Sequence, residues 1–149
     1  MKGFQFKIDG DWAHFKKPET NNNPLSHDLI PKTALIGMIG AVLGIEREKM
    51  KSLFPQLSED MLYGVELLKP VKKASCGFTS HTAINPTAIK SPKAFEMLRD
   101  VSYKVCVGLN GERSQSIFDD FQNAILEGYA VYDPYLGIAN CPAELSFIS

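Results

Sequence analysis

The chain has 149 residues, of which 44% are hydrophobic and 22% charged; this is the composition of a folded globular domain and argues against disorder. Sixteen basic and seventeen acidic residues give a net charge of −1, which excludes a uniformly basic nucleic-acid coat. A domain of this size buries enough surface to fold without a metal or a disulfide. We therefore expect a single domain over 1–149 with no cofactor and no metal.

The cysteines and the apolar stretches indicate the cellular compartment of the protein. Cys76, Cys106 and Cys141 are widely spaced and form no CxxC pair, which argues against a zinc site or a disulfide framework. The longest largely apolar stretch, 33–45, is too short to span a bilayer, and the N-terminus lacks the apolar core of a signal peptide. These features predict a cytoplasmic protein with no membrane partner.

The pattern of the first half of the chain predicts a strand, a loop, a helix and a second strand. Alternating apolar residues predict a half-buried strand at 4–9, which the turn signal Asp9-Gly10-Asp11 ends. The stretch 17–31 is rich in proline and asparagine and predicts an unusually long loop. Thr33 can cap a mostly buried helix over 34–43, and alternation returns at 63–68 as a second strand.

A basic stretch follows, at 69–93, with five lysines and no acidic residue. It predicts either a solvated loop or a loop that contacts phosphates. Pro92 can start a short helix through Leu98, and alternation over 101–109 predicts the next strand, which Asn110-Gly111 closes.

A helix over 114–127, stopped by Gly128, and a final strand within 143–149 complete the pattern. The order is then β-α-β, insert, β-α-β. This is the ferredoxin-like (RRM-like) arrangement, an α+β fold with helices on one face of an antiparallel sheet. The basic insert lies between the second and third strands.

Three glycines, Gly37, Gly40 and Gly44, fall on one face of the first helix. A glycine face lets another backbone approach closely. Two interpretations stay open: tight packing on the domain's own sheet, or docking of a partner.

No catalytic set is recognisable. The three histidines and three cysteines have no metal-ligand spacing, and neither a phosphate-loop nor a nucleophile motif is present. We predict that the protein is not an enzyme.

The remaining chemistry favours single-stranded RNA. Planar side chains that can stack on bases precede two lysines, in the run Trp12, His14, Phe15, Lys16 and Lys17. An alternative for Trp12 and Phe15 is that they cap the core. The basic stretch adds Lys72, Lys73, His81, Lys90 and Lys93.

Two blocks carry a resemblance to a known family. The stretch 6–18, FKIDGDWAHFKKP, resembles the opening of the CRISPR-associated Cas-five family, and 31–46, PKTALIGMIGAVLGIE, resembles its glycine-bearing first helix. Together they resemble the type I-B-like branch in particular. Further matches lie at 95–98 and at Tyr135-Leu136-Gly137 followed by Ala143-Glu144.

The resemblance implies a protein of the RAMP superfamily that is a subunit of Cascade, the type I interference complex. Such a subunit grips the 5′ handle of the guide RNA and contacts the backbone and large subunits. By carry-over, 12–17 and Lys32 lie near the handle, and 69–93 corresponds to the thumb that folds over the RNA. The catalytic set of the one branch that cleaves guide precursors does not map here.

Family members usually continue past the last matched block, so the resemblance implies a C-terminally shortened domain. Our main hypothesis is a dominant-negative inhibitor, an anti-CRISPR mimic that docks into Cascade. The alternative is a functional minimal handle-binding subunit, and a third hypothesis is a guide-processing ribonuclease. All RNA-binding versions require 12–17 and the basic insert to lie on one side of the molecule.

Overall fold

The computed structural model describes residues 3–20, 23–81 and 90–149, with the backbone alone at 79–81 and 90–91. The elements follow in the order β1 (Gly3–Ala13), α1 (Lys32–Leu43), α2 (Arg47–Asp60), β2 (Met61–Leu67), β3 (Lys73–His81), β4 (Lys90–Leu109), α3 (Gln115–Glu127) and β5 (Glu144–Phe147). The antiparallel sheet has the order β2-β4-β1-β5, and β3 pairs with β4 beside this path. The second half of β4 lies between β1 and β2, as in a ferredoxin-like fold, so the predicted fold class is confirmed.

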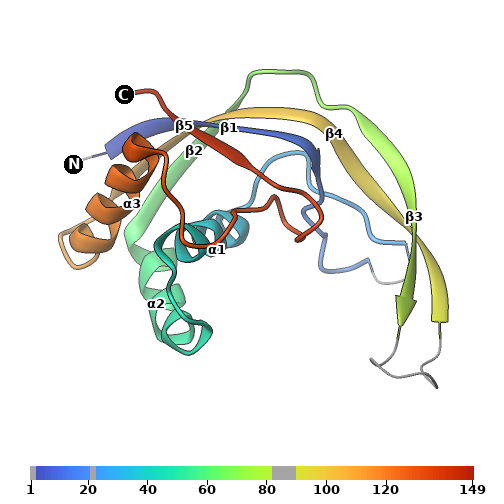
Figure 1. The fold of residues 1–149 in the computed structure, drawn as a ribbon, viewed down its shortest axis with the longest axis horizontal. Helices are drawn as coiled ribbons and strands as arrows, with labels where there is room; N and C mark the ends of the chain where they lie inside the picture. Colours follow the sequence, from blue (N-terminus) through green and yellow to red (C-terminus); the bar gives the residue numbers. More distant parts are fainter. Residues whose placement is uncertain (1–2, 21–22, 82–89) are drawn as a thin grey trace.

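The three helices lie on one side of a strongly curved sheet, which arches over them (Figure 1). Alternation along β1 explains this arrangement, since Phe4, Phe6 and Ile8 are buried on the helix side while the residues between them are half-buried. Phe6 meets Phe121 of α3 edge-on, with ring centroids 5.5 Å apart. The core therefore lies between the concave face of the sheet and α1 and α3.

The basic insert is a β-hairpin and not the predicted loop and helix. β3 pairs with the first half of β4 from Lys73 opposite Leu98 to His81 opposite Lys90, so the helix expected at 92–98 is a strand. The alanine, glutamate, methionine and leucine of this stretch favour a helix locally, but pairing with β3 and packing of Phe95 against Phe78 favour the strand. We call this hairpin the arm; it projects from the sheet at the end opposite α3 (Figure 1).

Further features differ from the sequence expectation. α1 begins at Lys32 with Pro31 as its N-cap, so Thr33 lies inside the helix and does not cap it. β1 does not end at the Asp9-Gly10-Asp11 turn signal but continues to Ala13, because β4 supplies partners as far as Leu98. The helix α2 was not predicted, since it is polar and contains Pro55, which removes a helical hydrogen bond. Asp60 at its end accepts a 2.6 Å hydrogen bond from the Ser114 hydroxyl and so fastens α2 to the start of α3.

The three glycines of α1 do not form a common docking face. A Cβ atom at Gly40 would lie 3.0 Å from the Met50 sulfur, so this glycine packs against α2 and not against the sheet. Gly44 ends the helix with φ +67°, a conformation that favours glycine. Of the three, only Gly37 opens onto free space, with nothing within 4 Å of the position that a Cβ atom would occupy.

None of the helices in the described ranges is long and apolar enough to cross a membrane.

Candidate functional site

A groove of about 310 Å³ lies on the concave side of the sheet. It is bounded by the segment after β1, by the small-residue face of α1 and by the loop before β5, with the lining residues His14, Phe15, Lys16, Pro31, Thr33, Ala34, Gly37, Met38, Ala41, Tyr135, Gly137 and Ile138. The groove exists because α1 presents short side chains here. Its exposed polar and aromatic members, Lys16 and Tyr135, are suited to a ligand that carries both charge and planar rings.

The loop 135–138 forms one wall because it is paired with the end of β1. The backbone N–H of His14 donates to the Leu136 carbonyl oxygen at 3.1 Å, and Leu136 is fully buried. Gly137 has φ +89°, and its backbone lies so close to His14 that a Cβ atom would collide with the His14 carbonyl oxygen. This close approach holds the loop 135–138 against the end of β1.

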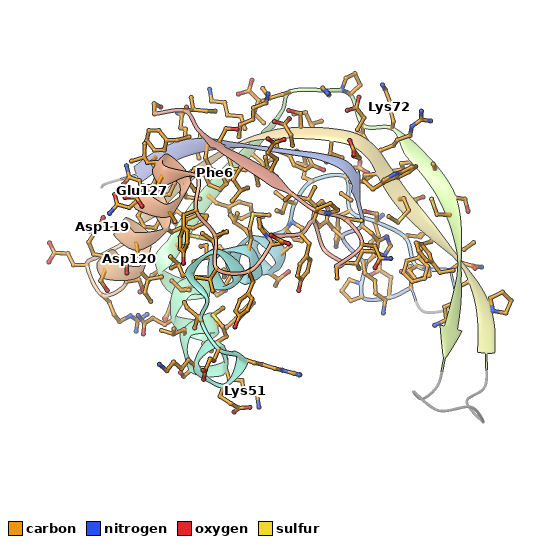
Figure 2. The ribbon with its side chains drawn as sticks, viewed as in Figure 1. Phe6, Lys51, Lys72, Asp119, Asp120 and Glu127 are labelled. Carbon is orange, nitrogen blue, oxygen red and sulfur yellow. The ribbon has the colours of Figure 1, made fainter. Side chains whose placement is uncertain are left out.

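The long loop 14–31 is fastened to the base of the arm. Three contacts reach Glu96 of β4. The His14 Nδ1 donates to the Glu96 carbonyl oxygen at 2.7 Å, and the backbone N–H of Glu96 donates to the Pro24 carbonyl oxygen at 2.9 Å. The Glu96 carboxylate accepts a third bond, from the Ser26 N–H at 3.2 Å. The segment 14–17 and the base of the arm are therefore neighbours. The basic stretch 69–93 meets the requirement of the RNA-binding hypotheses only in part, because Lys72 lies on the opposite, convex side of the sheet (Figure 2).

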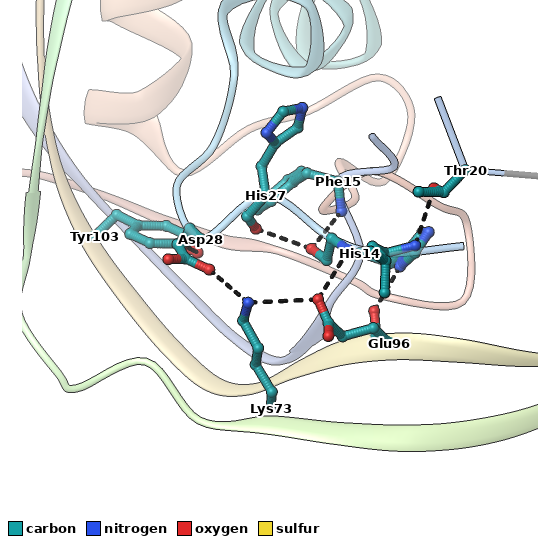
Figure 3. Close-up of polar contacts among 10 residues, drawn as sticks. His14, Phe15, Thr20, His27, Asp28, Lys73, Glu96 and Tyr103 are labelled. Carbon is teal, nitrogen blue, oxygen red and sulfur yellow. Dashed lines mark hydrogen bonds and ion pairs between the residues drawn. The ribbon is translucent and has the colours of Figure 1, made fainter. Parts of the chain in front are cut away.

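An ion pair reinforces this junction. Lys73 of β3 lies between Asp28 of the loop, at 2.9 Å, and the carboxylate of Glu96, at 3.4 Å (Figure 3). Its hydrogen bond to Asp28 raises the pKa of Lys73 and lowers the pKa of Asp28. Both groups stay charged around neutral pH, so this lysine is engaged within the protein.

The loop should loosen in acid because of this pair. The lowered pKa of Asp28 means that its stabilising contribution is present above its ordinary value, about 3.9, and is lost as the pH falls through the folded-state pKa. We expect the protection of the Glu96 amide against hydrogen exchange to fall a few-fold below about pH 4, since exposed pairs contribute little. An Asp28→Asn variant should start from the lower protection and show no such acid step. An unchanged acid step in that variant would assign it to another group.

His14 and Phe15 belong to the core and not to an exposed stacking surface. Their exposed fractions are 1% and 2%. The His14 Nδ1 must carry the proton, since it faces a carbonyl oxygen, and its Nε2 is buried without a partner among the described residues. For Phe15 the structure favours the alternative of core capping, and Trp12 is half-buried opposite Arg99 of β4.

Five of the predicted lysines divide into three groups. Lys16 is exposed and Lys17 half-buried beside the groove. Lys32 donates to the Ser58 carbonyl oxygen at 2.8 Å and, like Lys73, is engaged within the protein. Lys72 lies on the outer, convex side of the sheet, away from the helices and the groove (Figure 2).

The side chains of His81 and Lys90 lie outside the described residues, although their backbones pair at the far end of the arm. Tyr135 was missed as a site residue. It is 46% exposed at the groove, and the only sequence signal for it was its place in a matched block.

No group of three metal-ligating side chains occurs among the residues that the structure describes.

Comparison with known proteins identifies the class. The family model described as CRISPR-associated protein (Cas_Cas5) matches residues 3–148. The chain therefore belongs to this CRISPR-associated family, the one that the sequence resemblance named. A comparison with curated proteins found no match.

Solved CRISPR structures share the fold. A chain titled "CRISPR RNA-guided surveillance complex" superposes with a TM-score of 0.68 at 15% identity, over 93% of this chain and 58% of that one. A structure titled "Crystal Structure of CRISPR-associated Protein" gives 0.56 at 17% identity, over 99% and 67%. A type III-B Cmr-beta complex bound to target RNA gives 0.59 at 10% identity, over 97% and 63%. The chain thus spans about three fifths of the length of these relatives; at these identities the likeness concerns the fold alone.

Proposed function

We propose that this protein is a subunit of a CRISPR ribonucleoprotein that binds the 5′ handle of the guide RNA along the concave groove, in the cytoplasm. Its protein partners in this proposal are the backbone and large subunits of Cascade. The observation that carries the proposal is the junction at Glu96, which places the groove, the long loop 14–31 and the base of the arm side by side within a fold of this family.

The distribution of charge supports an approach of the RNA from the side of the groove. Asp119, Asp120 and Glu127 lie on α3, at the end of the molecule opposite the arm (Figure 2). An RNA backbone is repelled from the α3 end and attracted towards the exposed Lys16 beside the groove. Tyr135 offers an exposed ring at the groove on which a base can stack, a contact that contributes about 1–3 kcal/mol.

The salt dependence of binding tests the RNA contact. If Lys16, Lys17 and one further lysine touch phosphates, the logarithm of the affinity for handle RNA should fall with the logarithm of the salt concentration at a slope of roughly −2. Fluorescence anisotropy between about 50 and 300 mM salt would measure this slope. A flat dependence would remove the phosphate contacts. Replacing Lys16, which is exposed at the groove, should reduce the slope by about 0.7, while Lys51→Ala on the far end of α2 should leave it unchanged.

Docking into Cascade needs its own test. Co-purification with the backbone and large subunits, with and without ribonuclease, separates RNA-dependent docking from direct protein contact. Loss of all association in both conditions would refute the subunit proposal, even if the isolated protein binds RNA.

We further propose that the protein inhibits interference. As a Cas-five-like chain, it would occupy the handle site in Cascade and block the complex. Expression in a strain with an intact type I system should then lower interference in proportion to dose, because occupancy follows relative concentration and affinity. Restoration of interference in a strain that lacks its own handle-binding subunit would instead favour a working minimal subunit.

The ribonuclease hypothesis has a direct test. Incubation with repeat RNA in the absence of metal should leave the substrate intact if the protein only binds. Defined cleavage products would overturn the prediction that it is not an enzyme.

A further inference from the structure

The outer edge of β2 presents unpaired backbone groups. β2 is the last strand on its side of the sheet. The N–H of Leu68, the residue after the strand, donates to the Ser102 carbonyl oxygen at 3.0 Å, in register with the β2–β4 ladder. In an antiparallel ladder every second residue points its N–H and C=O groups at the same neighbour. The groups of Tyr63, Val65 and Leu67 therefore point outward, where no described segment pairs with them.

The side chains of this edge are unusually apolar for a surface strand. The exposed fractions are 43% for Leu62, 37% for Tyr63, 43% for Leu67 and 44% for Leu68. Tyr63 and Leu67 lie on the same side of the sheet as the core, opposite Val107 and Tyr103, but α1 and α2 leave them uncovered. Protein edge strands usually carry charges that prevent association, and this one offers a single charged side chain, Glu66.

We propose that this edge pairs with the same edge of a second copy of the protein, antiparallel about a twofold axis at Val65. In this register Tyr63 faces Leu67 of the second copy, Leu62 faces Leu68, and Val65 faces itself. The residues whose backbone groups point outward, Tyr63, Val65 and Leu67, then face one another across the axis. Their N–H and C=O groups can form about six hydrogen bonds, two for each of the three facing pairs. The two sheets become one continuous sheet with an isologous interface.

Charge and shape favour a copy of the chain as the occupant. Glu66, which pairs with Lys104 at 3.8 Å, would lie opposite Gly64 of the second copy, where nothing lies within 4 Å of the position that a Cβ atom would take, so its carboxylate meets no apolar side chain there. A shift of the axis to Gly64 would preserve the backbone parity but would place Leu62 opposite Glu66, an apolar group against a carboxylate. Of these two registers, only the one centred on Val65 places the apolar side chains of the edge against one another.

The state of association tests the proposal. Sedimentation equilibrium from about 1 to 500 µM should show a reversible monomer–dimer transition. The double variant Leu62→Lys and Leu67→Lys should shift its midpoint at least tenfold upward, because it places charges against apolar partners. The matched control Leu126→Lys, a leucine of α3 that is 55% exposed, should leave the midpoint unchanged. A monomer throughout this range, or equal effects of the two variants, would overturn the proposal.

Hydrogen exchange locates the interface without a mutation. The amides of Tyr63, Val65 and Leu67 should be protected at high protein concentration and lose protection at least tenfold on dilution. The amides of Leu62, Gly64 and Glu66, which bond to β4, should show no such dependence. Dimerisation with concentration-independent protection of the odd-numbered amides would place the interface elsewhere and refute the assignment to β2. The outcome does not depend on RNA binding.

Discussion

Replacing Gly137 with alanine should lower the free energy of unfolding by about 3 kcal/mol or more. Two costs add at this position. The φ of +89° is unfavourable for any residue with a side chain, and the new Cβ atom would collide with the carbonyl oxygen of His14, a backbone atom that cannot rotate away. Urea or thermal unfolding measures the loss.

Gly111 provides a matched control for this prediction. Its φ is +99°, but a Cβ atom added there would meet nothing within 4 Å. Gly111→Ala should therefore report only the backbone cost, about 1 kcal/mol. Equal losses in the two variants would show that the loop 135–138 moves away without cost, and that the wall of the groove is not held as closely as the structure indicates.

The order of the fold is predictable from the sequence because its elements are amphipathic. Phe4, Phe6 and Ile8 alternate with polar residues, and Phe118, Phe121 and Ile125 recur at helical spacing. Each of these patterns corresponds to a face that lies against the core. The turn at 110–111 and the glycine stop at Gly128 likewise lie where local chemistry predicts them.

The arm and α2 could not be predicted because long-range contacts determine them. The stretch 92–98 forms a strand only because β3 is present to pair with it. The helix α2 has a polar sequence with an internal proline, and its packing on Gly40 through Met50 carries no periodic signal. Local propensity is a weak guide where a partner strand or helix supplies most of the stabilisation.

At the candidate site, too, some features could be predicted from the sequence and others could not. The family resemblance singled out Lys16 as a site residue, and the structure places it at the groove beside α1. The burial of His14 and Phe15 does not, because the strand ends at Ala13 and alternation no longer says which side chains face the core. The engagement of Lys32 by Ser58 depends on α2, which the sequence did not reveal, and so a lysine predicted to reach RNA is bonded within the protein.

A substitution at Gly37 can separate the proposed RNA-binding role of the groove from the stability of the protein. A leucine at this position would project into the groove, since no atom lies within 4 Å of its Cβ. It would also remove a glycine from a helix interior, which should stabilise α1 by roughly 0.5–1 kcal/mol. We therefore expect Gly37→Leu to raise the melting temperature slightly and to weaken handle-RNA binding at least about tenfold, equivalent to about 1.4 kcal/mol.

Two control variants show whether a loss of RNA binding in Gly37→Leu comes from filling the groove. Gly37→Ala should give most of the stabilisation with little loss of binding, because a methyl group fills only a small part of a groove of about 310 Å³. Gly64→Leu, on the exposed β2 edge where a side chain also meets nothing within 4 Å, should leave RNA affinity unchanged. If Gly37→Leu binds RNA as tightly as the unmodified protein, the RNA does not occupy the groove, and the loop 14–31 or the arm must carry the contact from another face.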